Sequence, residues 1–539
     1  MHNLRRVFYT MLSAISCFGH ELHSISLEGA NVSDQTTETE LVDTELYETL
    51  ENGMPVLNSL PGAMGAIFLD LDGGPWPYTE YDLDPYGGDM VFDETEQAEI
   101  YRMWQDVATH FAMFDLNVTT IAPDKSVTPT AHVLISPSLP GGSSQTNVYG
   151  RTDENARSRC HSNSVISRST CITHELGHNL GLNHQSLYDT EGELVQSYRG
   201  GDEWGRSPFM GRDNWNGVYT HWANNTAINN VPQNDIERIA QKVREVALEF
   251  SAGAYTGDGF RPDDFADDIE DASEVCLEVV GEELGQTSLA FCQEGVIERF
   301  EDVDIFAFQW FGGELIIDVE AVKNNAAVPT YASSVGLNLR LLNSEGEELM
   351  RDMAENPADV FSTLTYEAEA GGLYYIEVSG AGEEADLGKY ELSMTGTTNV
   401  TPAYIEWIKP YGVMHNGYNE DPDHDLFTNL EEFGLGLDPT FPNVALPYFF
   451  TTPFVLTVPM RQGAVFSGES YQAATIDGIQ YTVRGSTDLI NYDEQVEVLP
   501  HSAIEETLPT LMEGYHYYNF LIPKAEGRGF MKIEIAPLN

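Results

Sequence analysis

Positively charged residues are scarce in this chain of 539 residues. It contains 26 Lys and Arg against 86 Asp and Glu, which gives a formal net charge of −60. A surface with this charge repels phosphate backbones and anionic lipid headgroups. We therefore expect neither nucleic-acid binding nor binding to a membrane surface, and most individual carboxylates serve solubility.

Long apolar runs are also missing. After residue 20, no run reaches the ~18–20 residues that a membrane-spanning helix needs. At the N-terminus, Arg5 and Arg6 precede a short apolar run from Val7 to Gly19, which is the pattern of a signal peptide. The sequence therefore predicts a signal peptide over residues 1–23 and an exported protein, located outside the cell, in the periplasm or at the cell surface. A buried first helix and a lipid anchor at Cys17 remain alternatives.

Cysteine is rare, with only five residues in the chain. Removal of Cys17 with the signal peptide leaves Cys160, Cys171, Cys276 and Cys292, and four cysteines allow three pairings. Export permits disulfides. The short separations within apparently separate domains favour Cys160–Cys171 and Cys276–Cys292, with free buried thiols as the alternative. The spacing of these cysteines suggests no thiolate metal site.

The periodicity of apolar residues changes along the chain. Apolar runs predict strands at 66–71, 116–120 and 132–135, and helical spacing predicts helices at 94–111, 169–180 and 234–250. From about residue 260 to 396, short strands separated by Gly and acidic turns take over. We expect such strands at 304–308, 314–319, 337–342, 374–378 and 390–394. A last strand is expected at 530–535.

These patterns predict a multidomain chain in which an α/β (α+β) domain precedes all-β sandwich domains. Besides the signal peptide, we expect a propeptide or flexible arm at 24–60 and the α/β domain at 61–258. A first β-sandwich at 259–397 and an acidic linker at 398–444 come next. A C-terminal β-rich accessory domain at 445–539 completes the prediction.

The most informative segment is His174-Glu175-Leu176-Gly177-His178-Asn179-Leu180-Gly181-Leu182-Asn183-His184. Residues four apart share one face of a helix, so His174 and His178 can bind one ion together. Gly181 permits a positive φ that ends the helix, and the chain can then bring in His184. Three neutral histidines suit Zn²⁺ and leave one position open for water, from which Glu175 can take a proton.

This segment resembles the HExxHxxGxxH motif of the metzincin clan of zinc metalloendopeptidases. The resemblance implies that His174, His178 and His184 are the zinc ligands and that Glu175 is the general base. It also implies that Met210, in Ser207-Pro208-Phe209-Met210-Gly211, forms the apolar floor beneath the ligands, although an ordinary core methionine is the alternative. Two departures leave the subfamily open, because Gln185 follows the third histidine and no Tyr stands two residues after Met210.

Residues 261–396 resemble bacterial pre-peptidase C-terminal domains, which are β-sandwiches found in secreted peptidases. The runs that carry the resemblance are 302–308, 312–315, 371–378 and 388–392. It implies a role in secretion, folding or substrate attachment. Asp302 and Asp304 have groups that bind Ca²⁺, but a solvated turn is the preferred interpretation.

The acidic linker contains a pattern of calcium ligands at 421–432. Asp421, Asp423, Asp425 and Glu432 occupy loop positions 1, 3, 5 and 12, and Phe427 supplies a carbonyl at position 7, as in an EF-hand. The segment resembles the dockerin-like calcium loops of secreted bacterial proteins. Leu426 replaces the usual Gly at position 6, so we expect weak Ca²⁺ binding in a structural role. Chance clustering in so acidic a chain is the alternative.

Together these features predict a secreted, monomeric zinc metalloendopeptidase of class EC 3.4.24. Its substrates would be proteins or peptides of the extracellular space, hydrolysed by a zinc-bound water that Glu175 activates. One rival is a non-catalytic secreted adhesin or matrix-binding protein with a structural zinc site, which would not need Glu175. Another is a zinc hydrolase that acts on bonds other than peptides.

Overall fold

The computed structural model describes most of the chain after residue 46. The described residues are 47–73, 91–136, 141–153, 157–161, 165–202, 204–211, 220–283, 285–323, 332–333, 335–356, 358–382, 387–413, 416–442, 449–451, 455–499, 508–523 and 529–538. The predicted signal peptide and most of the predicted arm lie outside this range.

The N-terminal domain is built on a five-stranded sheet with the order β2-β1-β3-β5-β4. Its strands are β1 (Gly65–Asp70), β2 (Leu116–Thr119), β3 (Thr130–Ile135), β4 (Gly141–Ser143) and β5 (Ser158–His161). The first strands pair in parallel, whereas β4 runs antiparallel to β5 at one edge. β1 and β3 are fully buried, as expected for strands at the centre of a layered α/β structure.

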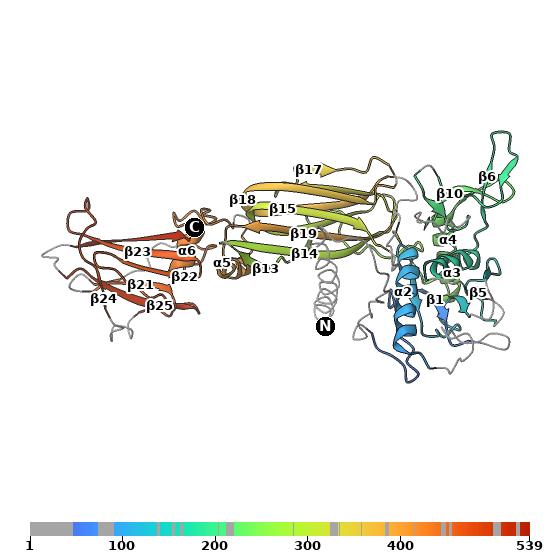
Figure 1. Ribbon diagram of the computed structural model, residues 1–539, viewed down its shortest axis with the longest axis horizontal. Helices are drawn as coiled ribbons and strands as arrows, with labels where there is room; N and C mark the ends of the chain where they lie inside the picture. The colour runs from blue at the N-terminus through green and yellow to red at the C-terminus, as the bar shows by residue number, and fades with distance from the viewer. Residues whose placement is uncertain are drawn as a thin grey trace, which may run out of the picture.

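Helices α2 (Glu94–His110) and α3 (Val165–Asn179) lie next to each other in this domain (Figure 1). α2 starts where it does because the Asp93 carboxylate accepts hydrogen bonds from the amides of Thr95 and Glu96, while the side chain of Glu96 reaches back to the Asp93 amide. Its apolar face, with Ile100, Met103 and Val107, is fully buried. The sheet and α2 thus form the platform on which α3 is held.

Residues 54–59, assigned above to the arm, pack against this platform. Leu57 is buried, its amide donates to the Thr120 hydroxyl at 3.0 Å, and the Ser59 amide donates to the Val118 carbonyl at 3.1 Å. In the structure, these residues belong to the N-terminal domain.

The polypeptide after α3 forms a second, four-stranded sheet and a further helix. The sheet has the order β11-β10-β6-β7 and contains β6 (Gln185–Tyr188), β7 (Leu194–Gln196), β10 (Asn224–Ala227) and β11 (Val231–Asn234). Two short strands, β8 (Ser207–Pro208) and β9 (Thr220–His221), pair separately. α4 (Asp235–Phe250) begins at the Asn234 cap and buries one face.

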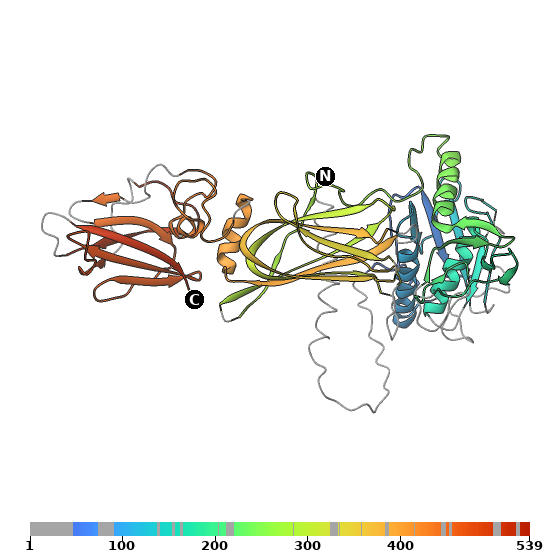
Figure 2. The ribbon, with the colours of Figure 1, turned by 90° about the horizontal axis from the view of Figure 1, so that it is seen from above.

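The central domain consists of one eight-stranded sheet whose long strands curve (Figure 2). Apolar side chains of these strands, such as Trp310 and Leu339, are fully buried. Its main path is β13-β14-β19-β15-β18-β16-β17, and β12 pairs with β15. The bounds are β12 (Ser273–Glu274), β13 (Glu278–Glu283), β14 (Gln286–Ile297), β15 (Val303–Ala321), β16 (Leu337–Leu342), β17 (Glu348–Asp352), β18 (Phe361–Gly380) and β19 (Gly388–Thr398).

The strands expected at 304–308 and 314–319 are one strand in the structure, β15. Gly312 and Gly313 have φ angles of 80° and 93°, and the register with β18 shifts between Phe311 and Gly313. The glycine pair therefore makes a bulge and not a turn, since the left-handed region that glycine tolerates lets the strand bend without ending.

The C-terminal part combines three short helices with two sheets. α5 (Pro402–Ile408), η2 (Lys409–Tyr411) and α6 (Asn429–Leu435) lie in the segment that the sequence assigned to a linker. The sheets have the orders β20-β21-β25-β24 and β22-β23-β26. Their bounds are β20 (Phe449–Thr451), β21 (Val455–Arg461), β22 (Gln472–Ile476), β23 (Ile479–Ser486), β24 (Glu497–Leu499), β25 (Tyr515–Leu521) and β26 (Phe530–Pro537).

α6 is part of the C-terminal core. The hydroxyl of Tyr481 donates to the Gly434 carbonyl and that of Tyr515 to the Phe433 carbonyl, both at 2.6 Å. The linker is thus a packed structural element.

The three parts follow one another along the long axis of the molecule (Figures 1 and 2). The multidomain, strand-rich architecture predicted from the sequence is confirmed. No helix in the described part of the chain has both the length and the apolar character needed to cross a membrane.

Candidate metal centre

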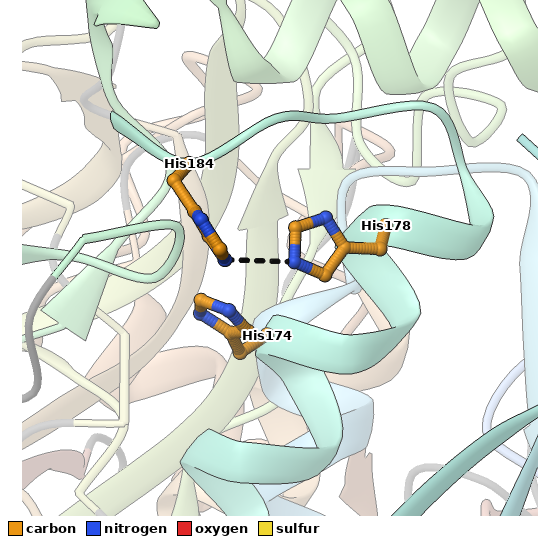
Figure 3. A group of neighbouring side chains, drawn as sticks. All are labelled: His174, His178 and His184. Atoms are coloured by element: carbon orange, nitrogen blue, oxygen red, sulfur yellow. Dashed lines mark hydrogen bonds between the residues drawn. The ribbon is translucent and has the colours of Figure 1, made fainter. Parts of the chain in front are cut away.

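Three histidine rings converge at the end of α3 (Figure 3). His174 and His178 are one helical turn apart, and their ring centroids are separated by 5.0 Å. The helix ends at Asn179, and the turn that follows contains Gly181, whose φ is 96° and whose amide donates to the His178 carbonyl. This turn returns the chain so that His184 Nε2 lies 3.0 Å from His178 Nε2.

The outer nitrogens of two rings are held by backbone carbonyls. His174 Nδ1 lies 2.6 Å from the Phe209 carbonyl, and His178 Nδ1 lies 2.8 Å from the Leu182 carbonyl. A carbonyl can only accept, so each Nδ1 carries the proton and each Nε2 keeps its lone pair. Burial lowers the pKa of His178, and it lowers the pKa of His174 and of His184 to about 4, with a further contribution from the His178 charge. These neutral, preoriented rings fit Zn²⁺.

Met210 lies directly against the histidine helix. A Cβ atom placed on Gly177 would be only 2.5 Å from Met210 Sδ, so the sulfur fills the space that a larger residue would occupy. Phe209 and Met210 are both buried, and the Gln185 amide donates to the Met210 carbonyl at 2.7 Å. The segment around Met210 therefore contacts α3 and the residue after the third histidine.

Glu175 faces the edge strand β4. A Cβ atom on Gly142 would lie 2.2 Å from Glu175 Oε1, which places the carboxyl group against the backbone of that strand. The side chain is only 7% exposed, and burial raises the pKa of Glu175 to about 7. A carboxyl group with this pKa can both take up and release a proton near neutral pH.

A disulfide fixes the start of this arrangement. Cys160 in β5 is bonded to Cys171 in α3, as the sequence predicted. Because Cys171 precedes His174 by one helical turn, the bond ties the histidine helix to the sheet.

The second predicted disulfide, Cys276–Cys292, is wrong. Cys276 is an exposed free cysteine, so it forms no bond with Cys292. Ser273 and Glu274 pair with β15, whereas the pairing of β13 with β14 begins at Glu278, opposite Ala290. Cys276 lies between these two paired segments and belongs to neither ladder.

Two features of the centre have no signal in the sequence. The ring of Tyr198 lies 4.3 Å from that of His184, centroid to centroid, and is 45% exposed. Gln185, fully buried, donates through Nε2 to Asp235 Oδ1 at 2.8 Å, and Gln233 donates to the same oxygen at 2.8 Å. Both depend on contacts between distant segments, so no local motif marks them.

The predicted calcium ligands are also close together. Carboxylate oxygens of Asp421, Asp423 and Asp425 lie within 4.8 Å of one another. The amides of Asp425 and Leu426 donate to the two oxygens of Asp421, at 3.2 Å and 3.0 Å. Leu426 has a φ of 80°, the conformation for which Gly is the usual residue.

The two remaining predicted calcium ligands are Glu432 and Phe427. Glu432 is buried in the first turn of α6, and its pKa is raised to about 8 by burial and by the charges of Asp423, Asp425 and Asp421. The Phe427 amide donates to Asp425 Oδ1 at 2.8 Å. The loop and the helix that follows it thus present their acids to one another.

No protein-family model and no curated protein matches this chain. Among solved structures, it matches the pre-peptidase C-terminal domain of a collagenase from Bacillus anthracis at 15% identity, covering 25% of this chain and 97% of that one, with a TM-score of 0.15. It also matches PliG, a periplasmic inhibitor of g-type lysozyme, from Aeromonas hydrophila at 12% identity, covering 24% of this chain and 96% of that one, with a TM-score of 0.15. We draw no functional conclusion from likenesses this weak.

Proposed function

We propose that this chain is an exported zinc endopeptidase in which His174, His178 and His184 hold the metal and Glu175 is the general base. The observation that supports it is the combination of three neutral, converging rings with a buried carboxyl group on the same helix. Among the described His, Cys, Asp and Glu side chains, these three alone form the group at this place, which would leave a zinc coordination position open.

Strand β4 offers a place for the substrate. It is the outermost strand of its sheet, and all three of its residues are exposed. An extended peptide can pair with such an edge through main-chain hydrogen bonds. A peptide paired there would pass the Glu175 carboxyl group, which lies against Gly142 of the same strand. The arrangement thus favours a polypeptide substrate over a small ester or amide.

Glu175 and the histidines would divide the chemical work. When bound, zinc supplies a Lewis acid that polarises the scissile carbonyl and acidifies water. Glu175 takes a proton from the attacking water and passes it to the departing amine, a transfer for which its raised pKa is suited. The carbonyls of Phe209 and Leu182 keep the ring nitrogens of His174 and His178 in the tautomer that binds metal.

A structural zinc site, as in the rival adhesin, would need no carboxyl group in the position of Glu175. A structural site closes its coordination shell with a fourth protein ligand, whereas Glu175 lies beside the three histidines in a position suited to proton transfer. We also propose that the 421–432 loop binds Ca²⁺ in a structural role, because carboxylate oxygens of Asp421, Asp423 and Asp425 lie within 4.8 Å of one another.

The decisive experiment compares the wild type with Glu175→Ala in the hydrolysis of a denatured protein, with zinc content measured on the same samples. Glu175→Ala should keep about one zinc per chain and lose several orders of magnitude of activity, since the base is removed while the ligands remain. Equal activity in the two proteins would exclude the proposed role of Glu175. Zinc retention without hydrolysis of any peptide by the wild type would favour the adhesin, and hydrolysis of non-peptide substrates alone would favour the other zinc hydrolase.

A further inference from the structure

The third histidine of the centre is held differently from the other two. The Nδ1 atoms of His174 and His178 donate to backbone carbonyls, whereas His184 Nδ1 has no hydrogen-bond partner among the described residues. His184 also lies beyond the end of α3 and not on the helix itself (Figure 3). The position of this ring therefore depends on the backbone that carries it.

Gln233 holds the residue that precedes this histidine. Its Oε1 accepts from the Asn183 amide at 3.1 Å, and its Nε2 donates to the Asn183 carbonyl at 2.8 Å. The side-chain amide thus pairs with the backbone of Asn183 as a neighbouring strand would. Gln233 is only 2% exposed, so water competes little for these two bonds.

Asp235 joins Gln233 to the residue that follows the histidine. Asp235 Oδ1 accepts from Nε2 of Gln233 and from Nε2 of Gln185, each at 2.8 Å. Asp235 Oδ2 accepts from the Ala223 amide at 3.1 Å. Asp235 and Gln185 are both fully buried. A carboxylate suits this place because it accepts at both oxygens and donates at neither.

These two side chains come from the start of α4. Gln233 belongs to β11, and Asp235 is the first residue of α4, so the Asn234 cap between them sets how far apart they lie. Arg238, in the same turn of the helix, donates from Nε to the Gly181 carbonyl at 3.1 Å. We call Gln233 and Asp235 the α4 clamp, because they hold the backbone on both sides of the third histidine.

We propose that the α4 clamp positions His184 for zinc, as the carbonyls of Phe209 and Leu182 position the other two rings. This inference rests on the zinc centre proposed above. Gln233 and Asp235 bond to the backbone and side chains beside His184 and to no ring nitrogen of the centre, so they are positioning residues. A ligand that is fixed before the metal arrives loses less freedom on binding, so the clamp should raise zinc affinity.

The clamp also gives a task to Gln185, the residue at which this sequence departs from the well-known subfamilies. The Gln185 amide donates to the Met210 carbonyl at 2.7 Å, while its side chain donates to Asp235. A change at Gln185 would disturb both connections at once. Gln233 is the better position for a test, since its printed bonds reach only Asn183 and Asp235.

The test measures the zinc affinity of the full-length protein after chelation, by competition with a chromophoric chelator. Gln233→Met keeps the length of the side chain but removes its amide group, so Asn183 loses both bonds. Zinc affinity should fall about 10–100-fold, the loss typical when an outer partner of a metal ligand is removed. Gln241→Met, at an exposed position of α4, is the matched control and should bind zinc like the wild type.

Two further comparisons separate positioning from a general effect on the fold. His184→Ala removes the ligand that the clamp serves, so adding Gln233→Met to it should not lower zinc affinity further. Asp235→Asn keeps an oxygen for the two glutamine amides, so it should bind zinc more tightly than Asp235→Ala. Thermal unfolding of the metal-free proteins sets a titration temperature at which every variant is folded.

The proposal is overturned if Gln233→Met binds zinc like Gln241→Met, or if it lowers the affinity equally with and without His184. It is also overturned if Asp235→Asn binds zinc no better than Asp235→Ala. Any of these results, with a wild type that binds zinc and hydrolyses protein, would leave the proposed function intact. A wild type that binds no zinc would overturn the proposed function and the role of the α4 clamp together.

Discussion

The three histidines of the candidate metal centre and the carboxylates of Asp263, Asp264, Asp267, Glu298 and Asp302, called the joint cluster below, are two groups of side chains that lie close together, but they are built in opposite ways. The histidine centre takes its donors from one short segment, 174–184, and all three are nitrogens that burial keeps neutral. The joint cluster takes oxygens from 263–267 and 298–304, and its members would be charged if they were exposed. Without metal, neutral rings at 3–5 Å tolerate one another, whereas carboxylates repel.

This difference extends to how each group is supported. The histidine centre is held by backbone carbonyls and by the Cys160–Cys171 disulfide, so it can exist without zinc and reserve the metal for chemistry. The joint cluster has no equivalent support for the Glu298 carboxylate, whose two oxygens have no hydrogen-bond partner. We therefore expect zinc removal to abolish activity with little loss of structure.

The largest effect should come from removing one ligand of the histidine centre. His178→Ala removes a direct ligand, so zinc affinity should fall by more than the about 10–100-fold that loss of an outer partner causes. Hydrolysis of a denatured protein should disappear with the metal, while the Ca²⁺-dependent shift in unfolding temperature expected from the 421–432 loop should persist. Elemental analysis after dialysis and thermal unfolding check both points on one sample.

His516→Ala, in the C-terminal part, is the control and should keep zinc. If His178→Ala retained the full zinc content, the ligand assignment would be refuted. If it also lost the response to Ca²⁺, the two sites would not be independent.

A smaller effect is expected when the three histidines stay intact and only the position of the Glu175 carboxyl group is disturbed. The Cβ atom of Gly142→Ala would overlap Glu175 Oε1 and would lie 2.9 Å from Cys171 Sγ. The sulfur is fixed by its disulfide, so the carboxyl group must move. A displacement of about 1 Å can reduce turnover about a hundredfold, so we expect this loss in kcat/KM with zinc content unchanged.

The neighbouring exposed Ser143 provides the comparison. Ser143→Ala alters the same strand without touching Glu175 and should retain most of the activity. Similar kcat/KM values for both variants would mean that Glu175 does not work from its position against β4.

The histidine segment was readable from the sequence because its geometry is local. Helical spacing and one glycine suffice to predict that His174, His178 and His184 can meet, and the structure brings them together. The same holds for α2, α4 and the acidic loop at 421–432, where ligand spacing is set by a few consecutive residues.

Features that depend on pairing between distant segments could not be read in this way. Asp302 was interpreted as part of a solvated turn because nothing local reveals that residues 263–267 fold onto it. The failed Cys276–Cys292 prediction also concerns pairing between segments, since Ser273 and Glu274 pair with β15 and the pairing of β13 with β14 begins only at Glu278. The sequence prediction divided β15 into two strands for a related reason. A glycine pair such as Gly312-Gly313 can mark either a bulge or a turn, and only the pairing with the neighbouring strand β18 shows which of the two it is.

The smallest effect is expected from a substitution in the 421–432 loop that leaves the charge of the loop unchanged and only relieves backbone strain at Leu426. Leu426 has a φ of 80° and is 89% exposed, so its side chain contributes little packing while its Cβ atom disfavours the conformation. Leu426→Gly removes this strain, and after the entropy that glycine loses we expect a net gain of about 1 kcal/mol, or about fivefold in Ca²⁺ affinity. Calorimetry with Ca²⁺ on the full-length protein after chelation would measure this affinity. Leu426→Ala removes the side chain but keeps Cβ, so it should bind Ca²⁺ like the parent. Equal affinities for the Gly and Ala variants would show that backbone strain does not limit this site.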